Sequence, residues 1–350
     1  MEYAYKKLNI PATATILDPF LGSGTTCVYA KEQGNPCYGR DVNEVALLAS
    51  RVKTYDYEIT LLKESLKKIY EAYPKITINK DLLKKYPDIV RKAFPLPVLM
   101  DLLKFKNAIE TAIEKQKYKE FFILALMNTS TICTYAEKHG GSIRINKHRK
   151  FPPVKIKFKQ IAKKMISDLE KVKFKGSEAQ IDIRKEDARF MKSVPDEEVN
   201  FIITSPPYLN KIEYTNVYAI EQYLFISPQY SKPAVRSFIG ETLKKEVEDV
   251  FKGRYALNTI AKAYFKDMKQ VVKEMARVLV PNGKGAVVIG QGCFPDGVIK
   301  SDELLAELME EEGLEVFEIE VGNERWCMRN RTRKVGIMQE NVIWFKKVKS

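Results

Sequence analysis

Cysteine and histidine are scarce in this chain of 350 residues, which has five cysteines and two histidines. No two cysteines are spaced as Cys-x-x-Cys, and they stand scattered at positions 27, 37, 133, 293 and 327. A disulfide framework or a zinc site is therefore not expected. We predict reduced, mostly buried thiols and no bound metal.

Long apolar runs are also missing. The run Phe121–Met127 is far shorter than the roughly 20 residues that a membrane-spanning helix needs. Residues 1–7 lack the basic-then-apolar layout of a secretory signal. Hydrophobic residues make up 45% of the chain and charged residues 30%, which suits a buried core in water. We expect a cytoplasmic protein with no membrane partner.

Basic residues outnumber acidic ones, 59 against 45, and the net charge is +14. The excess is concentrated in residues 138–175, which hold 13 Lys or Arg and 2 acidic residues. Such concentration predicts a surface that faces phosphates, with a solvated basic helix as the alternative. The predicted phosphate contacts are Arg144, Lys147, His148, Arg149 and Lys150 in this segment and Arg329, Arg331 and Arg333 in a second basic cluster.

The pattern of apolar runs predicts an α/β fold. The chain opens with two strands that each lead into a helix, an order that implies a parallel sheet. About seven strands are expected in a single sheet, the last two antiparallel. They lie at 14–17, 37–41, 179–184, 199–204, 285–289, 314–321 and 335–346.

A long insertion interrupts this pattern. It is rich in Lys and Glu, and helices are expected at 57–72, 79–93, 98–135 and 158–172. We therefore predict a first part of the α/β domain at 1–55, a helical and basic insertion at 56–175, and a second part of the α/β domain at 176–350.

The first strand leads into the loop Asp18-Pro-Phe-Leu-Gly-Ser-Gly-Thr-Thr26. Gly22 and Gly24 let the backbone turn tightly and approach a ligand. The helix that opens at Thr25 directs free N–H groups toward a carboxylate or phosphate. Asp41 follows Gly22 by 19 residues, close to the spacing at which an acid meets a ribose hydroxyl. This loop is expected to hold a small cofactor.

Two details favour S-adenosylmethionine over a nicotinamide cofactor. Asp18 places a carboxylate in the loop, which is unhelpful beside pyrophosphate and favourable beside a sulfonium. No lysine follows the glycines, so the loop is no phosphate-cradling P-loop. Asp187 follows the third strand and is placed to bind the adenine amine. The alternative is that Asp41 and Asp187 only cap strand ends, and it applies more to Asp187 than to Asp41. The predicted cofactor contacts are Asp18, Pro19, Phe20, Gly22, Ser23, Gly24, Thr25, Thr26, Asp41, Asp187 and Thr204.

A second loop, Thr204-Ser-Pro-Pro-Tyr208, follows the fourth strand. Pro206 and Pro207 stiffen it and favour extended geometry before them. A rigid loop can present the Ser205 hydroxyl and a backbone carbonyl as hydrogen-bond acceptors, while Tyr208 offers a ring for stacking. Two acceptors that grip an amine favour a pyramidal nitrogen and free its lone pair for attack on a methyl group. Ser205, Pro206, Pro207 and Tyr208 are the predicted catalytic residues. A Pro-Pro turn with a core tyrosine is the alternative reading.

In combination these two motifs resemble those of the S-adenosylmethionine-dependent DNA amino-methyltransferases, D-P-F-x-G-S-G-T-T and S-P-P-Y. The resemblance covers about 13–53 and 179–346. It implies a class I methyltransferase (Rossmann-like) fold with a seven-stranded, mostly parallel sheet, and the insertion as candidate target-recognition region. In that family the first residue of the tetrapeptide is often Ser in cytosine-N4 enzymes and Asp or Asn in adenine-N6 enzymes. Ser205 therefore resembles the cytosine-N4 type.

Two further segments superficially resemble motifs of the cytosine-C5 methyltransferases, Pro36-Cys37 and Glu340-Asn341-Val342. Cys37 precedes Asp41 instead of following the fourth strand, and Glu340 sits in the terminal strand. We interpret both as structural, and a covalent cysteine mechanism is rejected.

The leading hypothesis is a site-specific methyltransferase that converts cytosine in double-stranded DNA to N4-methylcytosine on a flipped base, in a restriction-modification system with a companion restriction endonuclease. One alternative is adenine-N6 methylation of DNA or methylation of an amine on RNA. Another is a non-catalytic DNA-binding protein with a degenerate methyltransferase fold.

Overall fold

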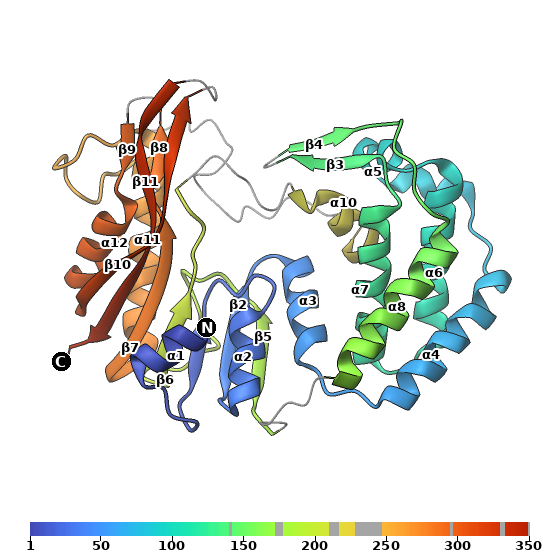
Figure 1. The fold of residues 1–350 in the computed structure, drawn as a ribbon, viewed down its shortest axis with the longest axis horizontal. Coiled ribbons are helices and arrows are strands. Elements are labelled where there is room, and N and C mark those ends of the chain that lie inside the picture. Colours follow the sequence, from blue (N-terminus) through green and yellow to red (C-terminus); the bar gives the residue numbers. More distant parts are fainter. Residues whose placement is uncertain are drawn as a thin grey trace. The chain divides into compact units, whose positions relative to one another are not determined.

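The computed structural model describes residues 1–139, 142–171, 178–209, 217–227, 247–294, 297–329 and 333–348 (Figure 1). The chain divides into two compact units. The first consists of Met1–Val42, Lys175–Ile212 and Ala234–Ser350, and the second of Asn43–Phe174 and Glu213–Pro233.

The described residues of the first unit form a seven-stranded sheet, with the strand order β10-β11-β7-β6-β1-β2-β5. The five strands from β7 to β5 run parallel, and β11 is antiparallel to both of its neighbours. The strands are β1 (Ile16–Asp18), β2 (Cys37–Asp41), β5 (Ile181–Lys185), β6 (Val199–Thr204), β7 (Leu279–Gly290), β10 (Leu314–Arg329) and β11 (Arg333–Lys347). The predicted fold class is confirmed.

Strand β7 differs in one respect from the prediction. It begins at Leu279, six residues before the expected start at 285, and so includes Pro281-Asn-Gly283, a sequence typical of a turn. Asn282 has a left-handed φ of 62°, and the register against β6 shifts between Val199 and Phe201. The turn residues are therefore accommodated as an irregular start of the strand.

Helices complete the first unit: α1 (Glu2–Leu8), α2 (Thr25–Gln33), α11 (Thr259–Val278) and α12 (Ser301–Glu311). In α11 the buried Tyr264, Met268, Val271 and Met275 recur every three or four residues, so one face of the helix is apolar. The Asn258 side chain caps this helix by accepting a hydrogen bond from the Ala261 amide. A short hairpin, β8 (Gly292–Phe294) and β9 (Gly297–Ile299), follows β7.

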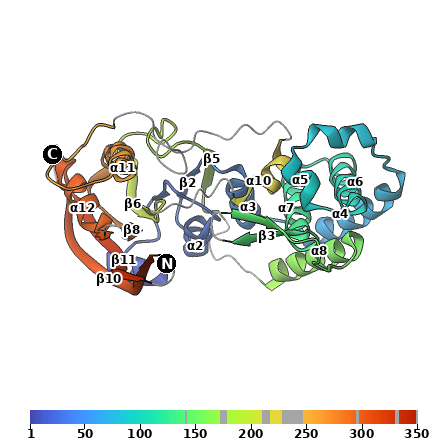
Figure 2. The ribbon, with the colours of Figure 1, turned by 90° about the horizontal axis from the view of Figure 1, so that it is seen from above.

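The second unit is mostly helical, and Figure 2 shows its helices α4, α6, α7 and α8 gathered as a bundle. Its core includes the ring pairs Phe105–Phe158 and Tyr73–Phe105, with centroids 4.8 and 4.3 Å apart. The helices are α3 (Glu44–Thr54), α4 (Ile59–Ala72), α5 (Asp88–Ala93), α6 (Leu96–Ala112), α7 (Gln116–Ile132), α8 (Val154–Lys171) and α10 (Ala219–Glu221), with shorter turns η1 (Tyr73–Lys75), η2 (Lys80–Lys85) and η3 (Gln222–Ile226).

Two features of this unit differ from the sequence prediction. The single helix expected at 98–135 is broken after Ala112, because α6 and α7 pack against each other and the chain must reverse between them. Strands β3 (Ala136–His139) and β4 (Ser142–Ile145) form an antiparallel pair that was not predicted. Gly140-Gly141 between two short alternating runs is the signal that could have revealed it.

Within the described part of the chain, no helix is long and apolar enough to cross a membrane.

Candidate active site

The carboxylate of Asp18 joins three segments of the first unit. Its Oδ2 accepts a hydrogen bond from Thr26 Oγ1 at 2.6 Å, and its Oδ1 accepts one from Thr204 Oγ1 at 2.7 Å. The Phe20 amide donates to the same Oδ1 at 3.1 Å. Because β1 and β6 are parallel neighbours, Asp18 and Thr204 end their strands at the same edge of the sheet. Asp18 therefore ties the predicted cofactor loop to the start of the predicted catalytic loop.

Burial raises the pKa of the Asp18 carboxyl to about 6, while the hydrogen bonds from Thr26, Thr204 and the Phe20 amide oppose that rise. The side chain is only 4% exposed. At neutral pH it is mostly ionised, yet its three hydrogen-bond donors are neutral groups. A cationic ligand group nearby would stabilise this buried charge, which fits the predicted sulfonium.

The loop after β1 turns through two glycines with left-handed backbone geometry. Gly22 and Gly24 have φ values of 54° and 90°, which side chains rarely adopt. Gly24 is the N-cap of α2 and no side chain caps this helix, so its first amides can meet a ligand carboxylate. The Gly22 amide donates to Asp41 Oδ2 at 2.8 Å, which fastens the loop to the end of β2. The predicted ribose contact at Asp41 stays a prediction.

The second loop contains a chain of hydroxyl groups. The Ser205 hydroxyl is exposed and lies 3.4 Å from the Tyr208 hydroxyl, to which it donates. The Tyr208 hydroxyl in turn donates to Glu340 Oε1 at 2.6 Å. Pro206, between them, is buried, which anchors the turn. With its hydrogen directed to Tyr208, the Ser205 oxygen keeps lone pairs that can accept hydrogens from an amine.

Glu340 was interpreted from the sequence only as a structural residue of the terminal strand. In the structure it pairs with Gly290 across β11 and β7, which brings it to the edge where the parallel strands end. Gly290 leaves room for the Tyr208 ring, since a Cβ there would lie 2.6 Å from Tyr208 Cδ2. The separation of 132 residues between Tyr208 and Glu340 left no local signal for this contact.

Asp187 is engaged by an arginine. It accepts hydrogen bonds from the amide and side chain of Arg189, whose Nη1 also donates to Asp267 at 2.9 Å. An adenine amine would have to share this carboxylate with Arg189. The predicted adenine contact therefore stays a prediction, beside the alternative that Asp187 shapes the turn after β5.

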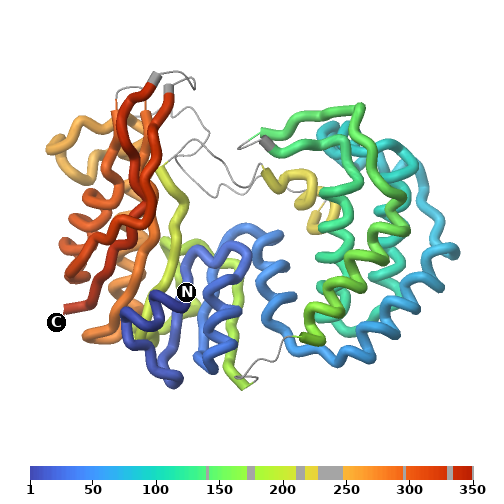
Figure 3. Tube along the Cα trace, viewed as in Figure 1, coloured from blue at the N-terminus to red at the C-terminus, as the bar shows by residue number. Residues whose placement is uncertain are grey.

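The predicted phosphate contacts of residues 144–150 lie in the second unit. Arg144, Lys147, His148 and Lys150 are exposed, whereas Arg149 is half-buried and its Nη1 donates to the Ala136 carbonyl at 2.7 Å. In the first unit, β10 and β11 run side by side as a long hairpin (Figure 3). The strand register pairs position 329 with position 333. Arg331 lies outside the described residues, as do the side chains of Arg329 and Arg333.

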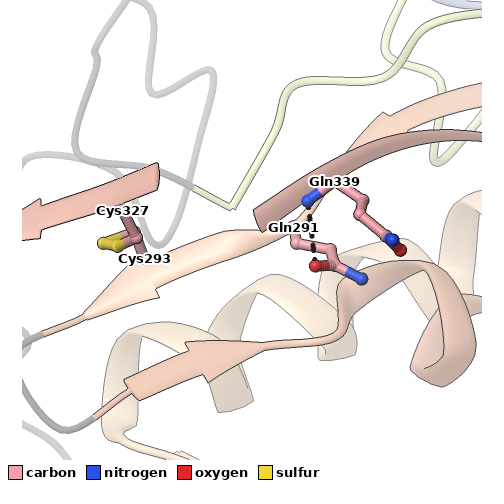
Figure 4. Close-up of a disulfide and its surroundings, with 4 residues drawn as sticks. All are labelled: Gln291, Cys293, Cys327 and Gln339. Carbon is pink, nitrogen blue, oxygen red and sulfur yellow. Dashed lines mark hydrogen bonds between the residues drawn. A yellow bond between two sulfur atoms is a disulfide. The ribbon is translucent and has the colours of Figure 1, made fainter. Parts of the chain in front are cut away.

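One sequence expectation was wrong: Cys293 of β8 and Cys327 of β10 form a disulfide, with their Cα atoms 5.9 Å apart (Figure 4). Beside it, the Gln339 amide donates to Gln291 Oε1 at 3.0 Å. The sequence could not show this pair, because it depends on how the hairpin β10–β11 meets β8. The other cysteines, 27, 37 and 133, are free and buried as expected.

Comparisons with known proteins find similarity to a DNA methylase family model and to type II methyltransferases. The family model N6_N4_Mtase, DNA methylase, matches residues 7–51, which contain the predicted cofactor loop. The type II methyltransferase M.BsoBI of Geobacillus stearothermophilus is 25% identical over 378 residues, covering 87% of this chain and 74% of that protein. M.AvaI of Nostoc sp. is 24% identical over 379 residues, covering 91% and 78%.

Two further similarities are more limited. The type II methyltransferase M.MvaI of Kocuria varians is 30% identical over 125 residues, covering 34% of this chain and 27% of that protein. A solved SAM-dependent methyltransferase of Methanosarcina mazei has a TM-score of 0.30 and 11% identity, over 97% of this chain and 95% of that one. That likeness is too low to support an argument, so the assignment of the fold depends on the strand order.

Proposed function

We propose that this chain methylates an exocyclic base amine at specific sites in DNA. The premise is that the family match and the type II relatives support a DNA amino-methyltransferase family. The observation that carries the proposal is the linkage of two loops through Asp18, one loop shaped for a cofactor and the other presenting Ser205.

S-adenosylmethionine is the cofactor, and it supplies the methyl group on a positively charged sulfur. The ionised Asp18 provides the negative potential that this charge favours. The uncapped N-terminus of α2 would receive the methionine carboxylate, and the end of β2 at Asp41 would receive the ribose. These roles rest on loop geometry and on the chemistry of the donor groups.

Ser205 would hold the amine. The Ser205 hydrogen is directed to Tyr208, the Tyr208 hydrogen is directed to Glu340, and the carboxylate at the end polarises both hydroxyls. The Ser205 oxygen and a backbone carbonyl of the loop would accept the two amine hydrogens, so that the nitrogen lone pair is free to attack. The amine proton can leave after transfer, and no histidine base is required.

The target base we propose is cytosine, methylated at N4 on a flipped nucleotide. Ser205 as the first residue of the tetrapeptide supports this choice. Adenine-N6 methylation would use the same loop chemistry, and RNA would offer similar amines. The modification would protect DNA against a companion restriction endonuclease, in keeping with the type II relatives.

The test is to incubate the protein with methyl-labelled S-adenosylmethionine and DNA of mixed sequence, digest the DNA to nucleosides, and identify the labelled one. Labelled N4-methylcytosine supports the proposal, and labelled N6-methyladenine keeps the mechanism while replacing the base. If, in a parallel incubation, only RNA accepts label, the proposal that DNA is the substrate is wrong. If neither DNA nor RNA accepts label while binding to DNA is intact, the non-catalytic alternative is favoured.

A further inference from the structure

A cavity of about 400 Å³ is lined by residues of the second unit, none of which is assigned so far to methyl transfer. One part of its wall is apolar and includes Phe94, Ala136 and Ile220. Another part is charged and includes Lys138, Arg149 and Glu221. The volume is in the range of small-molecule sites, in which apolar walls hold the body of a ligand and a few polar groups fix its orientation.

Glu221 is the unusual member of this wall. The side chain belongs to a residue that is only 3% exposed, and its Oε1 accepts a hydrogen bond from Lys138 Nζ at 2.7 Å. Its other oxygen, Oε2, is buried and has no hydrogen-bond partner among the described residues. A buried carboxylate oxygen without a donor is costly, so a donor from a bound ligand would stabilise it.

The neighbouring polar groups define what else the ligand must carry. The hydroxyl hydrogens of Ser130 and Thr134 are directed to the Met127 and Ala93 carbonyls, both at 2.7 Å, so these side chains offer the cavity only acceptors. Arg149 donates through Nη1 to the Ala136 carbonyl, and its guanidinium has four further N–H donors. The cavity therefore combines acceptors with a cationic donor beside an apolar surface.

We propose that this cavity binds one unstacked nucleobase of the DNA recognition sequence, with an amine donating to Glu221 Oε2 and a carbonyl accepting from Arg149. Cytosine and guanine each carry an amine and a carbonyl on the edge that pairs in the duplex. A base within the duplex cannot reach Glu221, because the residue is almost fully enclosed. This inference rests on the proposed function for the identity of the DNA, and it assigns a reading site separate from Ser205.

The experiment selects duplexes from a random library by binding to the full chain, so that it does not depend on methyl transfer. The wild type should select a C·G or G·C pair at one fixed position. Glu221→Gln presents an amide in place of the free acceptor, and it should lose discrimination at that position about tenfold or more. Preferences at the other positions should remain.

The matched control is Glu114→Gln, the same charge change at an exposed residue of the same unit that does not line the cavity. It should select as the wild type does. Arg149→Gln should relax the same position as Glu221→Gln, which guards against a folding defect in one variant. Replacing guanine by inosine at the selected pair weakens binding if the guanine amine is read, and leaves it unchanged if cytosine is read.

Unchanged selection by both Glu221→Gln and Arg149→Gln overturns the proposal, as does a wild-type chain that selects no sequence. Failure of the proposed function looks different. In that case the wild type selects a sequence and Glu221→Gln relaxes it, but neither protein transfers label to DNA.

Discussion

Asp18 shows how a single residue can oppose stability and favour ligand binding. Its folded pKa of about 6 lies above the ordinary value of 3.8, because burial disfavours the charge. Below pH 3.8 the carboxyl is protonated in both states and does not lower the free energy of unfolding. That free energy then falls as the pH rises through 6, because the unfolded chain ionises more easily than the native one. At neutral pH the shift of about two units corresponds to ~3 kcal/mol of lost stability.

The substitution Asp18→Asn tests both halves of this account. The variant should have a higher free energy of unfolding than the wild type. Measured by urea unfolding, this difference should be ~1 kcal/mol larger at pH 7 than at pH 5. Its affinity for S-adenosylmethionine should fall about tenfold or more by calorimetry, because the negative charge near the sulfonium is lost.

S-adenosylhomocysteine is the control ligand, since it lacks the positive charge. It should bind the wild type and Asp18→Asn with similar affinity. Equal losses for both ligands would mean that Asp18 acts only by holding Thr26 and Thr204 in place.

The hydroxyl chain from Ser205 to Glu340 gives a second prediction at this scale. Ser205→Ala should lower kcat about 100-fold, because the amine loses an acceptor, while affinity for DNA stays within twofold. Tyr208→Phe and Glu340→Gln should each lower kcat about tenfold, because they act through Ser205. Steady-state kinetics and DNA-binding titrations measure these effects.

The double variant Tyr208→Phe with Glu340→Gln tests whether both residues act on Ser205 through one hydrogen-bonded chain or lower kcat independently. If the two residues act along one chain, its kcat should match that of Tyr208→Phe alone. Multiplicative losses would contradict the chain and assign Glu340 an independent role.

At the scale of secondary-structure elements, the disulfide fastens β8 to β10. Cys293 and Cys327 are 34 residues apart, and closing such a loop stabilises a fold by ~3–4 kcal/mol in the chain-entropy description. Unfolded, unreduced protein should therefore react with thiol reagent at three cysteines and not five. Reductant should lower the melting temperature of the wild type.

The variant Cys293→Ser should melt at the lower temperature with or without reductant. Cys133→Ser, which removes a free buried cysteine, should keep the response to reductant. Five reactive thiols in the unreduced wild type would show that the bridge does not form.

The elements also show which parts of the structure the sequence could predict. Strands β1, β6 and β7 were predictable because each contains a buried apolar run, and Asp18 ends the first of these strands while Ser205 follows the second. The break between α6 and α7 was not, because it comes from packing of one helix on the other. Glu340 was missed because only the register of β11 against β7 brings it to Tyr208.

At the scale of the whole molecule, the basic surface predicts strong dependence of DNA affinity on salt. The slope of log affinity against log salt should be about −0.9 for each phosphate neutralised. Substituting Lys147 and Lys150 together by glutamine should reduce this slope by about 2, because both side chains are exposed in the basic segment.

Lys67 and Lys68, exposed on α4, provide a control pair with the same change of charge. Their replacement by glutamine should leave the slope unchanged. An equal effect of both pairs would mean that net charge alone, and not the segment around 144–150, attracts DNA.

The order of the strands also has a consequence during synthesis on the ribosome. Strand β1 pairs with β2 on one side, which follows within about 25 residues, and with β6 on the other, through Ile16 with Phe201 and Leu17 with Ile202. At 5–20 residues per second, β6 emerges about 10–40 s after β1. During that interval the helices α3 to α8 emerge as one continuous segment, while one edge of β1 still waits for its partner. A nascent chain of this protein therefore carries an open strand edge for most of its translation, a period in which a chaperone would have to protect it from other growing chains.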